Sequence, residues 1–233
     1  MEENLKEKLA AYKTPLQAAD IVKSTRVVFL VGVSGAGKDT VRKELLATGD
    51  FHHIVSHTTR PPRHNHGVLE QDGVDYHFVD FKKIEQMLDN TEFIEAKVFS
   101  NNVYGTSIAE IQAAHDARLI AISDLEIQGV SEYMAISPTV KPVFLLPPSY
   151  EIWQERLKRR YHENDIDPID ISRRLQTAKV ELQEALDKDY FYFVINNDLE
   201  SSISTVEAIA NDAVGKESTE EARAVAKDLL SKL

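Results

Sequence analysis

The sequence predicts an α/β protein in which a parallel sheet carries helices on both faces. Short apolar runs, such as VVFLV at 27–31 and VKPVFLLP at 140–147, have the length of buried strands. Helical segments alternate with these runs, which indicates β-α-β units joined by right-handed crossovers. A chain of 233 residues, 42% of them hydrophobic, is long enough to bury one substantial core.

The individual elements follow from the periodicity of the apolar residues. Strands are expected at 26–32, 52–59, 75–80, 92–100, 118–124, 140–147 and 190–197. Helices are expected at 3–23, 38–48, 81–89, 107–117, 149–161, about 169–186 and in two segments after 197, with a loop at 60–75. The charged stretch 162–170 separates two arginine-bearing helices, a pattern typical of a mobile lid.

Composition and charge exclude several classes of protein. No apolar run is long enough to span a bilayer, and the charged first residues do not form a secretory signal. The absence of cysteine excludes disulfides and thiolate chemistry and fits a reducing compartment, so we expect a cytoplasmic protein. The net charge of −11 argues against a nucleic-acid partner. The final Ser231-Lys232-Leu233 matches a peroxisomal address, but we interpret it as the end of the last helix.

A glycine-rich stretch, GVSGAGKDT at 32–40, directly follows the first strand and precedes a helix. Glycines allow main-chain N–H groups to converge on an anion, and the helix N-terminus adds the positive end of its dipole. Lys38 is placed to contact the β- and γ-phosphates, so the stretch predicts a nucleotide phosphate site. Asp39 stands where a Ser or Thr would usually contact Mg²⁺, and Thr40 follows one residue later. The alternative is a glycine-rich turn that binds no ligand.

A second group of polar residues lies between 56 and 106. Two arginines and two tyrosine hydroxyls are suited to a phosphomonoester, because charge-assisted forks are combined with neutral donors; they are Arg60, Arg63, Tyr76 and Tyr104. Glu95 can accept the paired N1–H and 2-amino donors of guanine, while Ser56 and Thr106 can donate to its O6 atom. Adenine would leave the carboxylate without its donors, which predicts its rejection.

In these segments the chain resembles the guanylate kinases, over about residues 26–211. The resemblance rests on the phosphate loop, on SHTTRPPR, DGVDYHFV, FIEA, VYGTS and DLEIQGV, and on PPS, RLKRR, RRL and VINNDLE. It implies a P-loop NTPase-type parallel sheet with helices on both faces, a small α+β GMP-binding insert and a helical lid. The implied domains are an N-terminal helical extension at 1–25, a kinase core at 26–56 and 107–215 with its lid at about 156–175, the insert at 57–106 and a C-terminal helix at 216–233.

The resemblance also implies the site residues. The catalytic residues would be Lys38, Arg160 and Arg174. The ATP site would consist of Gly32, Ser34, Gly35, Ala36, Gly37, Lys38, Asp39, Thr40, Arg156 and Asn196. The GMP site would consist of Ser56, Arg60, Arg63, Glu70, Tyr76, Glu95, Tyr104, Thr106, Asp124 and Glu126, and Mg²⁺ would be bound near Asp39 and Asp124.

The implied reaction is Mg²⁺-dependent phosphoryl transfer from ATP to GMP, giving ADP and GDP. No general base is required, because an oxygen of the monophosphate is already a competent nucleophile, so the protein supplies positioning and charge compensation. We expect the insert and the lid to close over the two small-molecule substrates, with neither nucleic acid nor membrane as a partner. The apolar stripes of the terminal helices are compatible with a homodimer.

Several departures from the family pattern keep alternatives open. Asp39 favours a related kinase that acts on a sugar phosphate such as ribose bisphosphate, although that hypothesis leaves the proposed base-binding residues unexplained. A non-catalytic guanylate-kinase-like binding module is the other alternative, and the catalytic lysine and lid arginines oppose it. Glu126 stands where the family has Asp, and HNHGVL lengthens the loop before Glu70. Six of the eight histidines lie between His52 and His77, and we interpret them as solvated residues rather than metal ligands.

Overall fold

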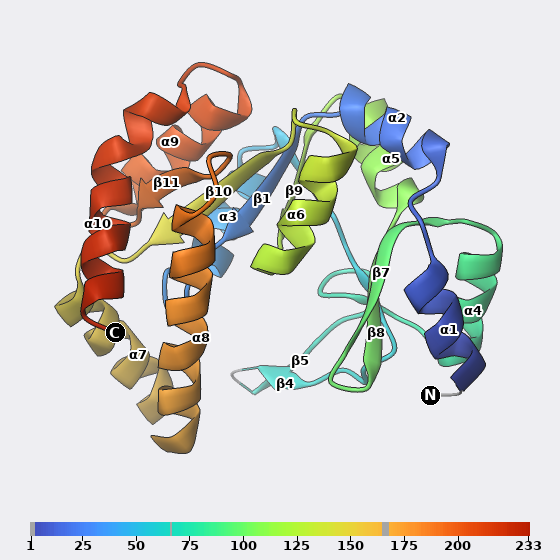
Figure 1. Cartoon of the computed structure of the whole chain (residues 1–233), viewed down its shortest axis with the longest axis horizontal. Coiled ribbons are helices and arrows are strands. Elements are labelled where there is room, and N and C mark those ends of the chain that lie inside the picture. The colour runs from blue at the N-terminus through green and yellow to red at the C-terminus, as the bar shows by residue number, and fades with distance from the viewer. Residues whose placement is uncertain (1–2, 66, 165–167) are drawn as a thin grey trace. The chain divides into compact units, whose positions relative to one another are not determined.

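The computed structural model describes residues 3–65, 67–164 and 168–233, and the side chains at 65, 160–164, 168–171 and 218 lie outside this description. The chain forms two compact units. Figure 1 colours the chain by residue number, so the segments of each unit can be followed there. Unit 1 contains Met1–Arg26 and His52–Ala121, and unit 2 contains Val27–Phe51 and Ile122–Leu233. The N-terminal extension therefore belongs to the same unit as the predicted insert.

A five-stranded sheet with the order β11-β10-β1-β9-β2 confirms the predicted α/β class. Its strands are β1 (Val27–Val31), β2 (Phe51–His53), β9 (Ile120–Asp124), β10 (Lys141–Leu146) and β11 (Tyr192–Ile195). Strand β10 pairs in parallel with β1, where Val28 is opposite Lys141, and with β11, where Phe144 is opposite Phe193. Every residue of β1 is buried, as expected for a central parallel strand whose two faces are both covered.

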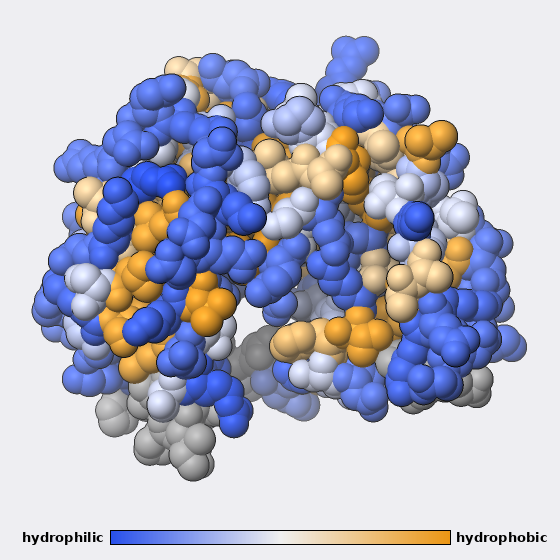
Figure 2. Space-filling view, in the orientation of Figure 1, coloured by the Kyte–Doolittle hydropathy of each residue, from blue (hydrophilic) through white to orange (hydrophobic). Residues whose placement is uncertain are grey.

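Helices of unit 2 pack in two groups beside this sheet. They are α3 (Lys38–Ala47), α6 (Ile127–Ile136), α7 (Tyr150–Asn164), α8 (Pro168–Leu186), α9 (Leu199–Ala210) and α10 (Glu220–Ser231), with a 3₁₀ turn at Lys216–Thr219. Helix α3 contacts α9, whereas α6 and α10 both contact α8. Apolar residues gather along the line where α8 and α10 meet (Figure 2). The stripe of α10, with Ala222, Ala226 and Leu229 buried, is thus covered within the chain.

Unit 1 is built on a four-stranded sheet with the order β6-β3-β8-β7. Its strands are β3 (His57–Thr58), β6 (His77–Phe78), β7 (Phe93–Phe99) and β8 (Asn102–Ser107), and a separate hairpin joins β4 (His64–Asn65) to β5 (Val68–Leu69). Its helices are α1 (Glu3–Ala11), α2 (Leu16–Ser24), α4 (Phe81–Asp89) and α5 (Ile108–Ala117). Leu5 and Leu9 of α1 join a core cluster with Ile84, Met87, Leu88, Phe93 and Val103.

The structure differs from the sequence prediction in several elements, including the β4–β5 hairpin, which forms inside the loop predicted at 60–75. The strand expected at 52–59 is divided, because β2 joins the large sheet and β3 joins the small one. The helix expected at 3–23 is two helices, with Pro15 at the N-cap of the second. Helix α6 and strand β8 were not expected: buried residues on several sides of α6 blur its period, and β8 is a polar strand paired on both edges. The lid break is shorter than predicted, since α7 ends at Asn164 and Pro168 begins α8.

Candidate functional site

The phosphate loop connects β1 to α3 in unit 2, and its shape depends on glycine. Gly32, Gly35 and Gly37 have φ angles of 142°, 85° and 92°, which side-chain-bearing residues rarely adopt. A Cβ atom on Gly32 would lie 2.3 Å from the carbonyl oxygen of Leu145, and one on Gly37 would lie 2.3 Å from Nδ2 of Asn196. The loop therefore passes so close to neighbouring segments that only glycine fits at these two positions.

Asn196, which follows β11, holds the loop from one side. Its Nδ2 atom donates to the carbonyl oxygen of Ala36 at 2.8 Å, and its Oδ1 atom accepts from the hydroxyl of Ser202 at 3.2 Å. The side chain of Arg156 donates to the main-chain carbonyl oxygen of Asn196 at 2.9 Å. Burial, followed by the nearby charge of Arg159, lowers the pKa of Arg156. In this structure Asn196 is thus a buried brace of the loop, and Arg156 is attached to the same segment.

Helices α7 and α8, which carry the predicted lid at about 156–175, both contact Ser34 in the loop. The indole Nε1 atom of Trp153, on α7, donates to the main-chain carbonyl oxygen of Ser34 at 2.8 Å. The Nη1 atom of Arg174, on α8, donates to its hydroxyl oxygen at 2.9 Å. The structure therefore places Arg174 against the glycine loop. The side chain of Arg160, the other predicted lid arginine, lies outside the described residues.

Lys38 is the first residue of α3, and its amine turns back onto the loop. It donates to the main-chain carbonyl oxygen of Gly32 and, at 3.5 Å, to that of Val33. Glu181 of α8, which the sequence analysis missed, interacts electrostatically with this lysine. Burial raises the pKa of Glu181 to about 7, opposed by Lys38 and reinforced by Glu126. Its spacing of seven residues from Arg174, two helical turns on one face, is the signal that could have identified it.

Two carboxylates come together near the start of α3 and the end of β9. Arg42 lies 3.4 Å from Asp39 and 3.8 Å from Asp124, measured between the ion-pairing atoms. The Oδ1 atom of Asp124 is buried and makes no hydrogen bond to any described residue. Burial raises the pKa of Asp124 to about 6, with Arg42 lowering it and Asp39 raising it further. Glu126 occupies the N-cap position of α6.

These carboxylates fit a magnesium ion that is shared with a nucleotide. Within the described parts of the chain, no group of three or more acidic, histidine or cysteine side chains could hold a metal ion by itself. Mg²⁺ commonly binds through one or two carboxylates together with phosphate oxygens and water. Asp39 and the buried, unbonded oxygen of Asp124 supply that kind of incomplete ligand set.

In unit 1, Arg60 and Glu70 form a buried bidentate pair. The Nη1 and Nη2 atoms of Arg60 donate to the two oxygens of Glu70 at 2.7 and 3.0 Å, and both side chains are less than a tenth exposed. Glu70 is the first cause of the raised pKa of Arg60. Glu70 also accepts from the main-chain N–H of Arg63 at 2.8 Å, so one carboxylate fixes both arginine positions. The added residues of the long loop form the β4–β5 hairpin, whose turn contains Gly67 at φ 78°.

The two predicted tyrosines lie beside Arg60. The guanidinium carbon of Arg60 is 5.2 Å from the centre of the Tyr76 ring, and the ring centres of Tyr76 and Tyr104 are 6.0 Å apart. Burial raises the pKa of the Tyr76 phenol, so it stays protonated as a hydrogen-bond donor at neutral pH. Arg60, Tyr76 and Tyr104 thus form one cluster, whereas Arg63 is exposed and is linked to it through its main-chain N–H to Glu70.

Glu95 and Thr106 lie opposite each other in the β7–β8 ladder. The main-chain N–H of Thr106 donates to Oε1 of Glu95 at 3.1 Å, and Thr106 is 2% exposed. Gly105, a position that the sequence analysis missed, permits this close pairing, because a Cβ atom there would lie 2.9 Å from the carbonyl oxygen of Glu95. Ser56 directly precedes β3, and its carbonyl oxygen accepts from the N–H of His77 at 2.9 Å.

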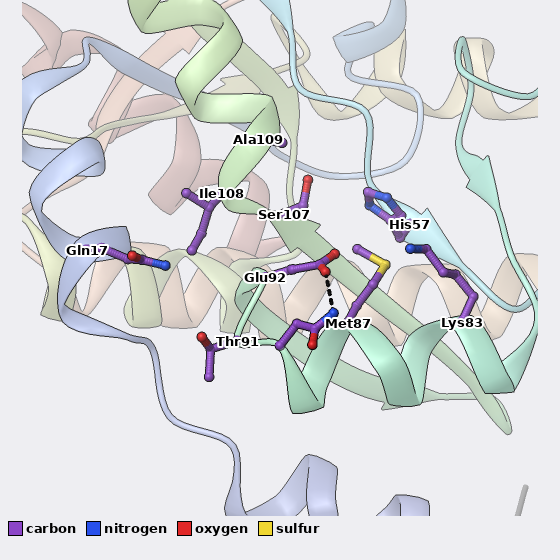
Figure 3. Close-up of a pocket in the computed structure, with 10 residues that line it drawn as sticks. Gln17, His57, Lys83, Met87, Thr91, Glu92, Ser107, Ile108 and Ala109 are labelled. Atoms are coloured by element: carbon purple, nitrogen blue, oxygen red, sulfur yellow. Dashed lines mark hydrogen bonds between the residues drawn. The ribbon is translucent and has the colours of Figure 1, made fainter.

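A pocket of about 330 Å³ also lies in unit 1. Figure 3 shows His57 and Lys83 at one end of this pocket and Gln17 and Thr91 at the other. No described residue from the predicted GMP set lines it. Burial, and then His77, lowers the pKa of His57 to about 4, against the opposing charge of Glu110. The pocket is thus lined by other residues, of which His57 and Ser107 directly follow Ser56 and Thr106 in the chain.

The chain is similar to known proteins along most of its length. The guanylate kinase family model matches residues 24–213. The guanylate kinase of Schizosaccharomyces pombe is 39% identical, covering 78% of this chain and 88% of the relative. That of Clostridioides difficile is 34% identical, covering 84% and 91%, and the human enzyme is 36% identical, covering 74% and 85%. A solved guanylate kinase from Anaplasma phagocytophilum has a TM-score of 0.58 and 27% identity, covering 83% of this chain and 88% of that chain.

Proposed function

Because the chain belongs to the guanylate kinase family, we propose that it transfers the γ-phosphoryl group of ATP to GMP, giving ADP and GDP. The observation that carries this proposal is that one chain contains two different groups of residues suited to bind an anion. Unit 2 provides a glycine loop that ends in a lysine at a helix N-terminus. Unit 1 provides a buried arginine with two tyrosines, and a separate carboxylate on a strand.

We assign the phosphates of ATP to the loop 32–40. The loop amides and the N-terminus of α3 would bind the phosphate oxygens, and Lys38 would exchange its bonds to loop carbonyls for bonds to phosphate. Arg174 already contacts the loop through Ser34, so it is close enough to compensate charge on the transferred group. The same role for Arg160 rests on the family resemblance alone.

Asp39 and Asp124 would hold Mg²⁺ together with the phosphates. When bound, the ion neutralises phosphate charge and orients the transferred group. In its absence Arg42 compensates the two carboxylates. An aspartate at position 39 is therefore compatible with a Mg²⁺ site, because Arg42 offsets its negative charge. Thr40 and Glu126 are assigned to the surroundings of the ATP and GMP sites by their positions in the motifs.

The GMP phosphate is assigned to Arg60, Arg63, Tyr76 and Tyr104. Glu70 has a positioning role in this assignment, because its carboxylate is already occupied by Arg60 and by the N–H of Arg63. A dianionic phosphate would bind beside this preorganised pair rather than to a freely rotating arginine. The guanine base is assigned to Glu95, Thr106 and Ser56, with Glu95 accepting from N1–H and from the 2-amino group.

The domain roles and the cellular setting follow from the same proposal. The GMP insert at 57–106, the core at 26–56 and 107–215, the lid at about 156–175, and the terminal segments at 1–25 and 216–233 are assigned as predicted from the sequence. Among the described residues, no helix is long and apolar enough to cross a membrane. The proposed location is the cytoplasm. The apolar stripes of α1 and α10 are buried within the chain, so they give no support to the predicted homodimer.

A coupled assay of ADP release tests the activity. Every reaction contains ATP and Mg²⁺. The rate of ADP release is compared among six acceptors, which are GMP, dGMP, AMP, CMP, UMP and ribose bisphosphate. GMP should give the highest rate, and GDP should appear in equal amount to ADP. Release of ADP with ribose bisphosphate instead would establish the sugar-phosphate alternative, and GMP binding without turnover would establish the non-catalytic module.

A further inference from the structure

The N-terminal segment before the family match is packed onto the unit that carries the proposed guanine site. The match begins at residue 24, whereas α1 spans Glu3–Ala11. Leu5 and Leu9 are buried against α4 and β7. The amine of Lys8 lies 2.9 Å from Glu85 and 2.8 Å from Asp89 on α4. The segment is thus attached by both apolar packing and charge.

Two hydroxyl groups of this segment bond to the main chain at the start of β7. The hydroxyl of Tyr12 donates to the carbonyl oxygen of Phe93 at 2.7 Å and accepts from the N–H of the same residue at 3.2 Å. The hydroxyl of Thr14 donates to the carbonyl oxygen of Ile94 at 2.9 Å. Partial burial raises the pKa of Tyr12, which keeps its phenol protonated for these bonds. The main chain of two neighbouring residues, Phe93 and Ile94, is therefore held by residues about 80 positions earlier.

These bonds fall on an irregular part of the ladder. Phe93 is opposite Ser107 and Glu95 is opposite Thr106, so the register shifts by one residue at Ile94. A β-bulge of this kind changes the direction of the following side chain and leaves main-chain groups to be satisfied from elsewhere. Tyr12 and Thr14 supply hydrogen bonds at the bulge, and the next residue is Glu95.

From this arrangement we infer that residues 3–14 act as a strap that positions Glu95 and thereby sets the preference for guanine. The inference rests on the proposed function of Glu95. In this account Tyr12 and Thr14 are positioning residues that act through the β7 bulge and do not touch the substrate. Their loss should change the recognition of the base while leaving ATP binding intact, because every contact of the strap described above lies in unit 1.

The test compares the double variant Tyr12→Phe/Thr14→Val with Lys13→Ala, an exposed position between them. The Michaelis constant is measured for GMP and ATP, together with the ratio of kcat/KM for GMP to that for IMP, which lacks the 2-amino group. The double variant should raise the KM for GMP about 5- to 10-fold and lower the GMP/IMP ratio, because it removes the three hydrogen bonds that hold the bulge. The KM of the double variant for ATP should stay within about twofold of the parent value, since the change removes no contact to ATP. All kinetic constants of Lys13→Ala should also stay within about twofold of the parent values.

Glu95→Gln in the parent chain separates the two proposals. If Glu95→Gln lowers the GMP/IMP ratio but the double variant does not, the strap is refuted while the assignment of Glu95 stands. If Glu95→Gln leaves the ratio unchanged, both the assignment and the strap are overturned. A double variant that loses rate equally toward GMP and IMP, with both KM values unchanged, also refutes the strap, since loss of folded protein alone would give that result.

Discussion

The two proposed anion sites, one in each unit, are built by different physical means. In unit 2 the proposed phosphate site is made of main chain, and its shape is fixed by glycines that approach Leu145 and Asn196 closely. In unit 1 the corresponding site is made of side chains, and its geometry is fixed by the charge pair of Arg60 and Glu70. The first site should therefore be sensitive to the addition of a single methyl group. The second should tolerate changes in shape but not the removal of one charge.

The largest effect is expected from Gly32→Ala. The new methyl group would meet a main-chain oxygen of β10 that cannot rotate away, at a φ of 142°. We expect a loss of stability of about 3 kcal/mol or more, with activity reduced by at least about 100-fold, measured by urea unfolding and by ADP release.

Gly49→Ala is the matched control for this change. Gly49 also has a positive φ, of 84°, but no described atom lies within 4 Å of the added methyl group. It should lose only the strain of the backbone, about 1 kcal/mol. If the two variants lost the same unfolding free energy, backbone strain, rather than the close approach of the loop to β10, would account for the effect of Gly32→Ala.

Lys38→Ala should lower turnover by about 10²- to 10³-fold, the scale of removing one electrostatic stabiliser of the transition state. The amine contacts the loop carbonyls, so a modest change in stability is also expected. Steady-state kinetics at saturating ATP and GMP measure the effect, with the exposed Lys43→Ala on the same helix as control. Turnover close to that of the parent would remove Lys38 from the mechanism.

Glu70→Gln should mainly weaken GMP binding. The change leaves Arg60 buried without its carboxylate partner, which costs up to about 3–5 kcal/mol for a fully buried pair. We expect the KM for GMP to rise by about 10-fold or more, because the arginines lose their fixed orientation, while the KM for ATP stays constant. If both constants rose together, the role of Glu70 would not be confined to unit 1.

The smallest effect concerns pH. Burial lowers the pKa of His57 to about 4, below its usual value near 6.5, so the unfolded chain binds this proton more readily than the folded one. The free energy of unfolding should therefore fall as the pH decreases from about 6.5 to 4, by about 1–2 kcal/mol after allowance for solvent screening. His77, Lys83, Glu92 and Glu110 are the charged or titratable neighbours.

Replacement of this histidine tests the pH effect. His57→Gln should flatten the slope of unfolding free energy against pH in that window, whereas the exposed His64→Gln should keep it. An unchanged slope in His57→Gln would assign the pH dependence to other groups.

The sequence predicted the parts of the molecule that local patterns specify. The strands of the large sheet and most helices of unit 2 follow from apolar periodicity, and the glycine loop and the guanylate kinase resemblance follow from sequence motifs. Strand β8 and helix α6 were missed because their residues take their structure from neighbours on several sides rather than from their own period. The division of 52–59 between two sheets likewise has no local signal, since both halves form strands.

Within the candidate site, the residue types could be predicted, but their partners could not. The family resemblance implied that Glu70 belongs to the GMP site, yet only the fold shows that Arg60 and the Arg63 amide occupy its carboxylate. The brace formed by Asn196 and the bulge contact of Tyr12 join residues far apart in the chain through main-chain carbonyls, which every residue carries. Such contacts leave no mark on composition or periodicity.

Calorimetric binding to the separate ligands tests the division between the two units most directly. GMP and a non-hydrolysable ATP analogue are titrated one at a time into Lys38→Ala and Glu70→Gln. The account predicts that Lys38→Ala weakens the binding of the ATP analogue and leaves the affinity for GMP unchanged, and that Glu70→Gln does the reverse. The account would be contradicted if either substitution lowered the affinity for GMP and the affinity for the ATP analogue to the same extent.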